Sequence, residues 1–244
     1  MKISAAWHKG RLLLRILLVV AVLGALAVVL QPVATFAILE TLFPRIVWRV
    51  STSQPLAALS FDDGPVPAYT GQVLEILARH GAKATFFAIG SRAAAHPWML
   101  DRIRREGHEV GNHYLNGGIT LVDSPAVFVA KVRRAEQILG IKGSQRLFRP
   151  PSGLIWPAQI DDLERSGYRC VLGSAYPYDP TRPPVAYMRW LVVKNLRPGT
   201  IVILHDGIPD PSKSIAALRG ILLAGAKRGL RFVTVSRLLE AQGK

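Results

Sequence analysis

From residue 56 onward, short β-rich runs alternate with longer segments of helical periodicity. The runs that we expect to form strands are 56–61, 83–89, 108–112, 146–148, 168–172, 200–204 and 230–235. The helical patterns between them are 71–80, 97–106, 124–139, 157–166, 185–194 and 213–228, and we expect Ser124 to cap the third of these helices, with Pro125 at its first position. Such alternation indicates parallel strands joined by helical crossovers, so the fold class is α/β. An open doubly wound sheet and a closed barrel both satisfy the pattern.

The chain ahead of this alternation is first basic and then apolar. Four positive charges lie at Lys2, Lys9, Arg11 and Arg15, and residues 16–30 carry no charged or strongly polar side chain. A helix that spans a membrane needs about 20 mostly apolar residues. The segment 12–30, interrupted only by Arg15, supplies them.

This start is typical both of a cleaved signal peptide and of a retained anchor. No clear small-x-small cleavage site follows the apolar run, so we favour a retained single-pass transmembrane helix. The basic end would face the cytoplasm, and the rest of the chain would lie on the extracytoplasmic side of the membrane. We therefore expect an anchor at 1–40, a connector at 41–55 and the α/β domain at 56–244.

The net charge of +15 raises the question of a nucleic-acid partner. The basic residues are spread along helical segments, and no recognition motif accompanies them, so we expect solvated helix faces and no nucleic acid. Attraction to an anionic membrane or cell-wall polymer stays open. The chain has a single cysteine, Cys170, which cannot form an internal disulfide. The oligomeric state is left open.

Polar side chains gather where the expected strands end. They are Asp62 and Asp63 after the first strand, His113 after the third, Arg149 after the fourth, Asp179 beyond the fifth, and His205 with Asp206 after the sixth. The carboxyl ends of parallel strands meet on one face, where α/β proteins place their active sites. We expect these side chains to converge there.

This set of residues suits metal-assisted hydrolysis. One carboxylate and one histidine would hold a divalent ion, the second carboxylate would act as general base, and the second histidine as general acid. Neighbouring side chains in a strand point to opposite faces, so Asp62 and Asp63 can have different tasks. The metal and Arg149 would relieve the repulsion between them.

Five ordered motifs carry a resemblance to a known family. The chain resembles the polysaccharide deacetylases of carbohydrate esterase family 4, the NodB-homology group, over residues 56–239. The motifs are "SFDDGP" (60–65), "ATFFAIG" (84–90), "GHEVGNH" (107–113), "FRPPSG" (148–153) and "ILHD" (203–206). The resemblance implies a distorted (β/α) barrel of about seven strands. It also implies removal of N-acetyl groups from N-acetylglucosamine in chitin-like or peptidoglycan-like glycans.

The resemblance also assigns roles to individual residues. Asp62 matches the base that activates a water and Arg149 the arginine that holds this base. His205 matches the acid that protonates the leaving amine, and Asp179 the carboxylate that orients His205. Asp63 and His113 match ligands of a divalent metal, for which we expect zinc. The candidate substrate contacts are Ser152, Trp156 and Tyr178, of which the last two would either stack on sugar rings or simply pack.

The chain departs from the family pattern at three places. Most relatives have a second metal-binding histidine four residues after the first, and here that position is Gly117. Asn116 and Asp123 are nearby alternatives without the family spacing. "RPPY" has become "RPPS", ending in Ser152, and Pro180 replaces an aromatic residue usual near Asp179.

Three functions remain open on these residues. The first is a metal-dependent N-deacetylase anchored in a membrane. The second is a weak or catalytically silent glycan-binding relative, which the glycine at 117 favours. The third is an O-deacetylase, because cleavage of an ester demands less of the metal. A base and an acid together favour an enzyme, since a binding module needs neither.

Overall fold

The computed structural model describes residues 2–31, 33–143 and 146–243. Within these ranges the side chains of residues 2–13, 28 and 33 are outside the description. The basic side chains Lys2, Lys9 and Arg11 of the expected anchor therefore lie outside the described residues.

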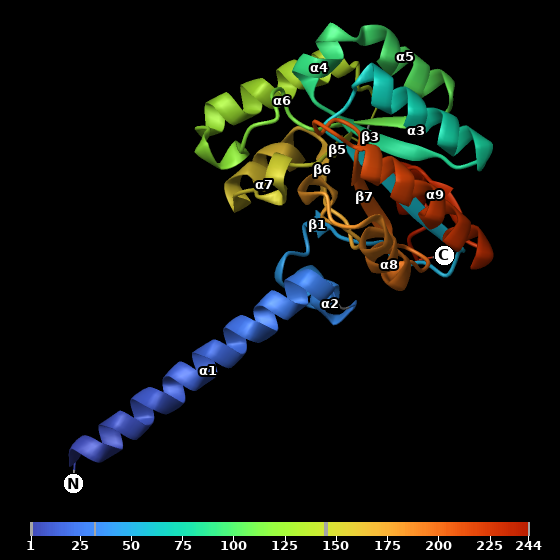
Figure 1. The fold of residues 1–244 in the computed structure, drawn as a ribbon. Helices are drawn as coiled ribbons and strands as arrows, with labels where there is room; N and C mark the ends of the chain where they lie inside the picture. Colours follow the sequence, from blue (N-terminus) through green and yellow to red (C-terminus); the bar gives the residue numbers. More distant parts are fainter. Residues whose placement is uncertain (1, 32, 144–145, 244) are drawn as a thin grey trace.

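Parallel strands form the centre of the fold (Figure 1). The seven expected strands are all present, as β2 (Leu56–Asp62), β3 (Ala84–Ala88), β4 (Glu109–Asn112), β5 (Arg146–Phe148), β6 (Tyr168–Val171), β7 (Ile201–His205) and β8 (Arg231–Val233). A further short strand, β1 (Ile46–Val47), pairs in parallel with β6 and lies in the segment expected to be a connector. The order is β1-β6-β5-β4-β3-β2-β7, and β8 pairs with the first residues of β2.

Two isolated bridges connect the ends of this series of strands. Ala175, just beyond β6, pairs in parallel with Val202 on β7, and Arg49, just beyond β1, pairs with Thr200. The sheet thus curves back on itself, as a distorted (β/α) barrel does. Of the two arrangements that the sequence left open, the barrel is the one adopted.

Helices cross over between the strands and cover the outside of the barrel (Figure 1). The expected helices are α3 (Pro67–Arg79), α5 (Pro97–Arg105), α6 (Pro125–Leu139), α7 (Pro157–Arg165), α8 (Val185–Asn195) and α9 (Ser212–Lys227). Proline stands at the start of α3, α5, α6 and α7, where its missing N–H costs nothing. Ser124 holds the cap position of α6, but its side chain makes no capping hydrogen bond, which corrects our expectation. The short helices α4 (Gly90–Ala95) and α10 (Val235–Leu239) were not expected.

The core is packed on both faces of the central strand. All seven residues of β2 are buried, and the rings of Phe61 and Phe86 stack at 5.2 Å between their centroids. A strand that is buried on both faces reads as a continuous apolar run, as "LAALSF" does. The packing leaves the carboxyl end of β2 fixed at the centre of one rim.

Two helices precede the barrel. The first, α1 (Lys2–Leu30), projects from the domain as a long rod, and α2 (Val33–Leu42) lies between it and the barrel (Figure 1). Apolar side chains of α1 between Leu14 and Leu30 are exposed, among them Leu17 at 57 % and Leu23 at 60 %. None of the helices in the described part of the chain has the length and apolarity to cross a membrane, so the transmembrane helix that we expected at 12–30 is not found there.

Candidate active site

A pocket of about 470 Å³ opens at the carboxyl ends of the strands. The expected catalytic and metal-binding residues meet there, since Asp62, Asp63, His113, Arg149 and His205 all line it. Asp179 lies directly behind His205. The convergence predicted from the strand ends is therefore found for these residues, while Asp206 is absent from the pocket lining and accepts a hydrogen bond from Thr70.

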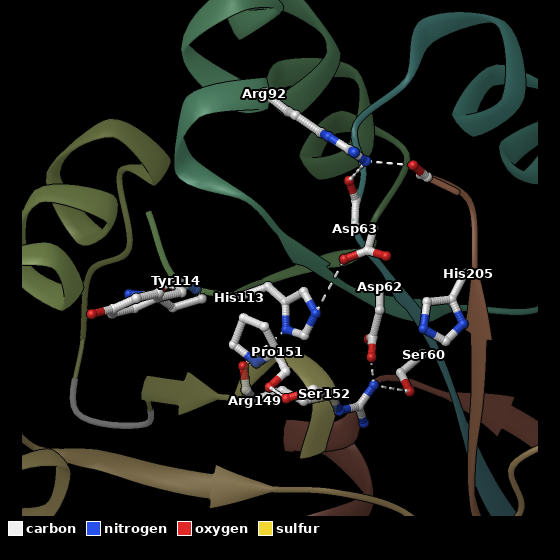
Figure 2. A network of polar contacts seen from close by, with 12 residues as sticks. Ser60, Asp62, Asp63, Arg92, His113, Tyr114, Arg149, Pro151, Ser152 and His205 are labelled. Carbon is white, nitrogen blue, oxygen red and sulfur yellow. Dashed lines mark hydrogen bonds and ion pairs between the residues drawn. The ribbon is translucent and has the colours of Figure 1, made fainter. Parts of the chain in front are cut away.

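Asp62 is held by Arg149 inside the barrel. The Nη1 atom of Arg149 donates to Oδ1 of Asp62 at 2.6 Å and to Oγ of Ser60 at 2.8 Å (Figure 2). Its Nε and Nη2 atoms donate to the carbonyls of Val171 and Leu172. Arg149 is only 2 % exposed, and its guanidinium lies 4.0 Å from the ring centroid of Phe87. A buried arginine with these partners cannot turn away, so it fixes one oxygen of Asp62 and balances its charge.

His205 and Asp179 form the second buried pair. The Nδ1–H of His205 donates to Oδ1 of Asp179 at 2.9 Å, which leaves Nε2 for the pocket. Oδ2 of Asp179 accepts from the backbone N–H of His205 at 2.8 Å and from Oγ of Ser214 at 2.7 Å. Burial disfavours the charged imidazolium, but the hydrogen bond and charge of Asp179, with Asp62 and Asp63 nearby, outweigh it and raise the pKa of His205 to about 9. A protonated His205 at neutral pH is suited to donate a proton.

Asp63 and His113 make a third corner of the pocket. Asp63 has a left-handed backbone, with φ of 72°, which turns its side chain away from that of Asp62. The Nδ1 atom of His113 lies 2.8 Å from the carbonyl oxygen of Arg149, and a carbonyl can only accept, so this nitrogen carries the proton. The Nε2 atom faces Oδ1 of Asp63, 3.4 Å away (Figure 2).

This corner fits one edge of a metal site. Two ligands on a tetrahedral zinc ion lie about 3.4 Å apart, and a metal-binding histidine usually donates its other N–H to a carbonyl or carboxylate. Burial acts to raise the pKa of Asp63, but His113, His205 and Arg92 act against it and the pKa is lowered, which keeps the carboxylate ionised. Among the described residues, no three His, Cys, Asp or Glu side chains lie close enough together to share an ion.

Gly117 lines the pocket beside this corner, as the family spacing requires. Its φ lies outside the left-handed region, and an added Cβ would meet only the end of the Ile89 side chain, at 2.9 Å. The two alternative ligands are not available there. Asp123 accepts from the hydroxyl of Tyr114 and from Nζ of Lys131, and Asn116 is exposed outside the pocket lining.

The three candidate substrate contacts have different positions. Ser152 and Tyr178 line the pocket, and the ring of Tyr178 lies 4.9 Å from that of Tyr176. Trp156 is 55 % exposed, its indole N–H donates to the carbonyl of Leu121, and it is absent from the pocket lining. Trp156 therefore lies outside this pocket, and its stacking on a sugar ring stays a prediction.

Several residues of the site were missed from the sequence. Ser60 and Ser214 complete the hydrogen bonds of Arg149 and Asp179. Arg92, on α4, donates through Nη1 to the carbonyls of Asp63 and Gly207, and so ties the end of β2 to the loop after β7 (Figure 2). The ring of Tyr176 lies 6.0 Å from that of His205. Ser60 could have been predicted, because it lies two residues before Asp62 and therefore on the same face of the strand. No sequence pattern links Ser214, Arg92 or Tyr176 to the site.

Comparison with known proteins agrees with this geometry. The family model described as polysaccharide deacetylase matches residues 49–171. A peptidoglycan-N-acetylglucosamine deacetylase of Bacillus cereus is 40 % identical over 80 % of this chain and 93 % of its own length. A chitooligosaccharide deacetylase of Sinorhizobium fredii is 36 % identical over 76 % and 92 %.

A solved structure gives the same result at the level of the fold. A peptidoglycan N-acetylglucosamine deacetylase superposes with a TM-score of 0.76 at 26 % identity, covering 82 % of this chain and 95 % of the other. The chain therefore belongs to the polysaccharide deacetylases of carbohydrate esterase family 4, and it is a hydrolase of that family.

Proposed function

We propose that this enzyme removes N-acetyl groups from N-acetylglucosamine residues of a peptidoglycan-like or chitin-like glycan, with the help of a divalent metal. The main support is that two ion pairs meet at one pocket. In the first, Arg149 holds the buried carboxylate of Asp62; in the second, Asp179 binds His205, whose pKa is raised. The names of the relatives support the substrate class.

The acid and base act in sequence on an amide bond. Asp62, fixed by Arg149, takes a proton from a water whose oxygen attacks the acetyl carbon. His205 gives its Nε2 proton to the sugar nitrogen as the carbon–nitrogen bond breaks, and Asp179 stabilises the charged imidazole until then. Acetate and a free amine on the sugar are the products.

Asp63 and His113 would hold the metal. A divalent ion at this corner would polarise the acetyl carbonyl and lower the pKa of water. Catalytic zinc usually has three protein ligands. With Gly117 in the third position, we expect the ion to bind weakly and to be lost on dialysis. This gap is also the observation that favours the second candidate, a weak or silent glycan-binding relative, and the third, an O-deacetylase.

The proposal is tested with Asp62→Asn, which keeps the size of the side chain and its contact with Arg149. Loss of the base should lower the rate of acetate release from N-acetylglucosamine oligomers, in the presence of added zinc, by at least about 10²-fold. Circular dichroism checks the fold. Equal rates for the variant and the wild type would exclude Asp62 as the base. A wild type that binds oligomers and releases no acetate would support the silent relative, and release from O-acetylated glycans alone would support the O-deacetylase.

We also propose that α1 attaches the enzyme to a membrane, with the catalytic domain on the extracytoplasmic side. Support comes from the exposed apolar side chains of α1 and from the basic residues that precede them. Cell fractionation with protease added to intact spheroplasts tests this. We expect the enzyme in the membrane fraction and its domain digested. A soluble enzyme, or one protected until lysis, would contradict it.

A further inference from the structure

One wall of the catalytic pocket comes from the helices that precede the barrel. The residues of this N-terminal wall are Ala27, Gln31, Thr35, Phe36 and Leu39. In α2, Thr35, Phe36 and Leu39 lie on one side of the helix, because residues three and four apart are neighbours on its surface. The same pocket is lined by Asp63, His113 and His205, so the wall and the proposed catalytic residues enclose one space.

Gln31 fastens this wall to the loop that follows β6. Its Nε2 atom donates to the carbonyl of Tyr176 at 2.5 Å, and its Oε1 atom accepts from the N–H of Tyr176 at 3.1 Å. Gln31 is 5 % exposed and has a left-handed backbone, with φ of 43°, at the bend between α1 and α2. A non-glycine residue in that region is uncommon, and here the side-chain amide binds both backbone groups of one residue, Tyr176.

Contacts on both sides of the bend hold the helices in place. At the end of α1, the carbonyls of Val29 and Leu30 accept from the hydroxyl of Tyr187 and from Nζ of Lys194, both on α8. These are carbonyls that a helix leaves without an internal partner, and a lysine there also suits the helix dipole. On α2, both carboxylate oxygens of Glu40 accept from Arg49, at 2.6 and 2.8 Å. The segment is docked by specific polar contacts and not by apolar contact alone.

The wall is mostly apolar and lies next to the reacting groups. Phe36 is 7 % exposed and lines the pocket, as do Leu39 and Ala27. Pockets that bind organic ligands are mostly apolar with a few polar groups, and the carbon–hydrogen faces of a pyranose ring suit such a surface. The proposed acid, base and metal ligands act on a single acetamido group. The pocket of about 470 Å³ extends well beyond these residues.

We propose that α1 and α2 are part of the substrate-binding site, and that the N-terminal wall contacts the sugar next to the one that loses its acetyl group. This inference rests on the deacetylase function proposed above. It makes the N-terminal segment a determinant of specificity: the wall favours oligomers over a single sugar, because only an oligomer reaches it.

The test compares two truncations on the same helix of the full-length chain. Phe36→Ala removes the ring from the wall, while Ile38→Ala removes an apolar side chain that is 59 % exposed and outside the pocket lining. The measured quantity is the ratio of kcat/KM for the N-acetylglucosamine hexamer to kcat/KM for the monomer, with zinc added. We expect Phe36→Ala to lower this ratio about threefold to tenfold and Ile38→Ala to leave it unchanged.

A second variant guards against undocking or misfolding of Phe36→Ala. Ala27→Leu keeps good helix propensity and adds bulk to the same wall, so it should lower the ratio as well. Thermal unfolding checks that each variant is folded. An unchanged ratio in Ala27→Leu and in a folded Phe36→Ala, with an active wild type, would overturn the inference and leave the proposed function intact.

An inactive wild type would count against the proposed function and not by itself against the wall. In that case calorimetry with the hexamer decides: weaker binding by Phe36→Ala than by Ile38→Ala supports the wall. Equal binding by the two variants, or no binding by the wild type, overturns it.

Discussion

The acid–base half and the metal half of the pocket differ in how completely their side chains are supported. Asp62 and Asp179 are buried, and each is fixed by a charged partner and by further hydrogen bonds around that pair. In the metal half, Nε2 of His113 lies 3.4 Å from Oδ1 of Asp63, and the Asp63 side chain is 27 % exposed. Gly117 occupies the position where the family has a second histidine. The groups that move protons are thus held rigidly, while the corner that would hold an ion is open.

This difference separates two sources of catalysis. Rigid, buried pairs keep their geometry whether or not an ion is present, because their partners come from the chain itself. Occupancy of the metal corner depends on the concentration of the free ion, because two protein ligands hold an ion less tightly than three. We therefore expect an enzyme with complete proton-transfer groups whose activity follows the metal concentration.

Breaking the Asp62–Arg149 pair should have the largest effect. Arg149→Met leaves Asp62 as a buried charge without a counterion, and we expect a loss of about 3–5 kcal/mol in the free energy of unfolding, together with loss of activity. Urea unfolding measures the loss. The control is Arg169→Met, since Arg169 is exposed on β6 and should change stability by less than about 0.5 kcal/mol.

The double variant Arg149→Met with Asp62→Asn sharpens this prediction. It removes the unpaired charge, so it should be more stable than Arg149→Met alone. If the two variants unfold at the same urea concentration, the cost comes from the lost packing of Arg149 and not from the buried carboxylate.

Removing the partner of His205 should have the next largest effect. Asp179→Asn keeps an acceptor for the Nδ1–H of His205 but removes the charge that raises the pKa of His205 to about 9. We expect a decrease in kcat of about 10-fold to 100-fold.

The pH profile distinguishes this role from a structural one. The wild type should lose activity as the pH rises through about 9, where His205 gives up its proton. In Asp179→Asn this alkaline limb should move toward the ordinary histidine pKa of about 6.5. The exposed Asp101, changed to Asn, serves as control. An alkaline limb at the same pH in wild type and Asp179→Asn would exclude the Asp179–His205 pair as its source.

The sequence could predict the rim of the pocket because each residue there follows directly from its own strand. The positions at or just beyond the ends of parallel strands are Asp62, His113, Arg149 and His205. The alternation of strands and helices, with the parallel topology that it implies, is enough to bring such positions together. The distorted barrel followed from the family resemblance, since alternation alone fits an open sheet equally well.

What the sequence could not predict depends on tertiary contacts between distant or irregular segments. Gln31 and Tyr176 are 145 residues apart, and neither belongs to a pattern that pairs them. The apolar composition of 12–30 suggested an anchor, and composition does not reveal that the following bend forms a wall of the pocket. Asp123 was an alternative metal ligand on sequence grounds, yet Tyr114 and Lys131 bind its carboxylate.

The metal half is tested most directly by restoring the missing ligand. Gly117→His places an imidazole beside His113, in a backbone conformation that accepts a side chain, with only the flexible end of Ile89 to displace. The matched control is Gly118→His, one residue further along, outside the pocket lining and without a close neighbour for its Cβ. Both variants and the wild type are first dialysed against a chelator.

Calorimetric titration with zinc, followed by acetate release at each zinc concentration, is the decisive measurement. We expect weak zinc binding and zinc-dependent activity in the wild type and in Gly118→His. In Gly117→His we expect a zinc dissociation constant lower by about tenfold or more, with activity at correspondingly lower zinc concentrations. Zinc affinity in folded Gly117→His equal to that of the wild type, or full wild-type activity after removal of metal, would contradict it.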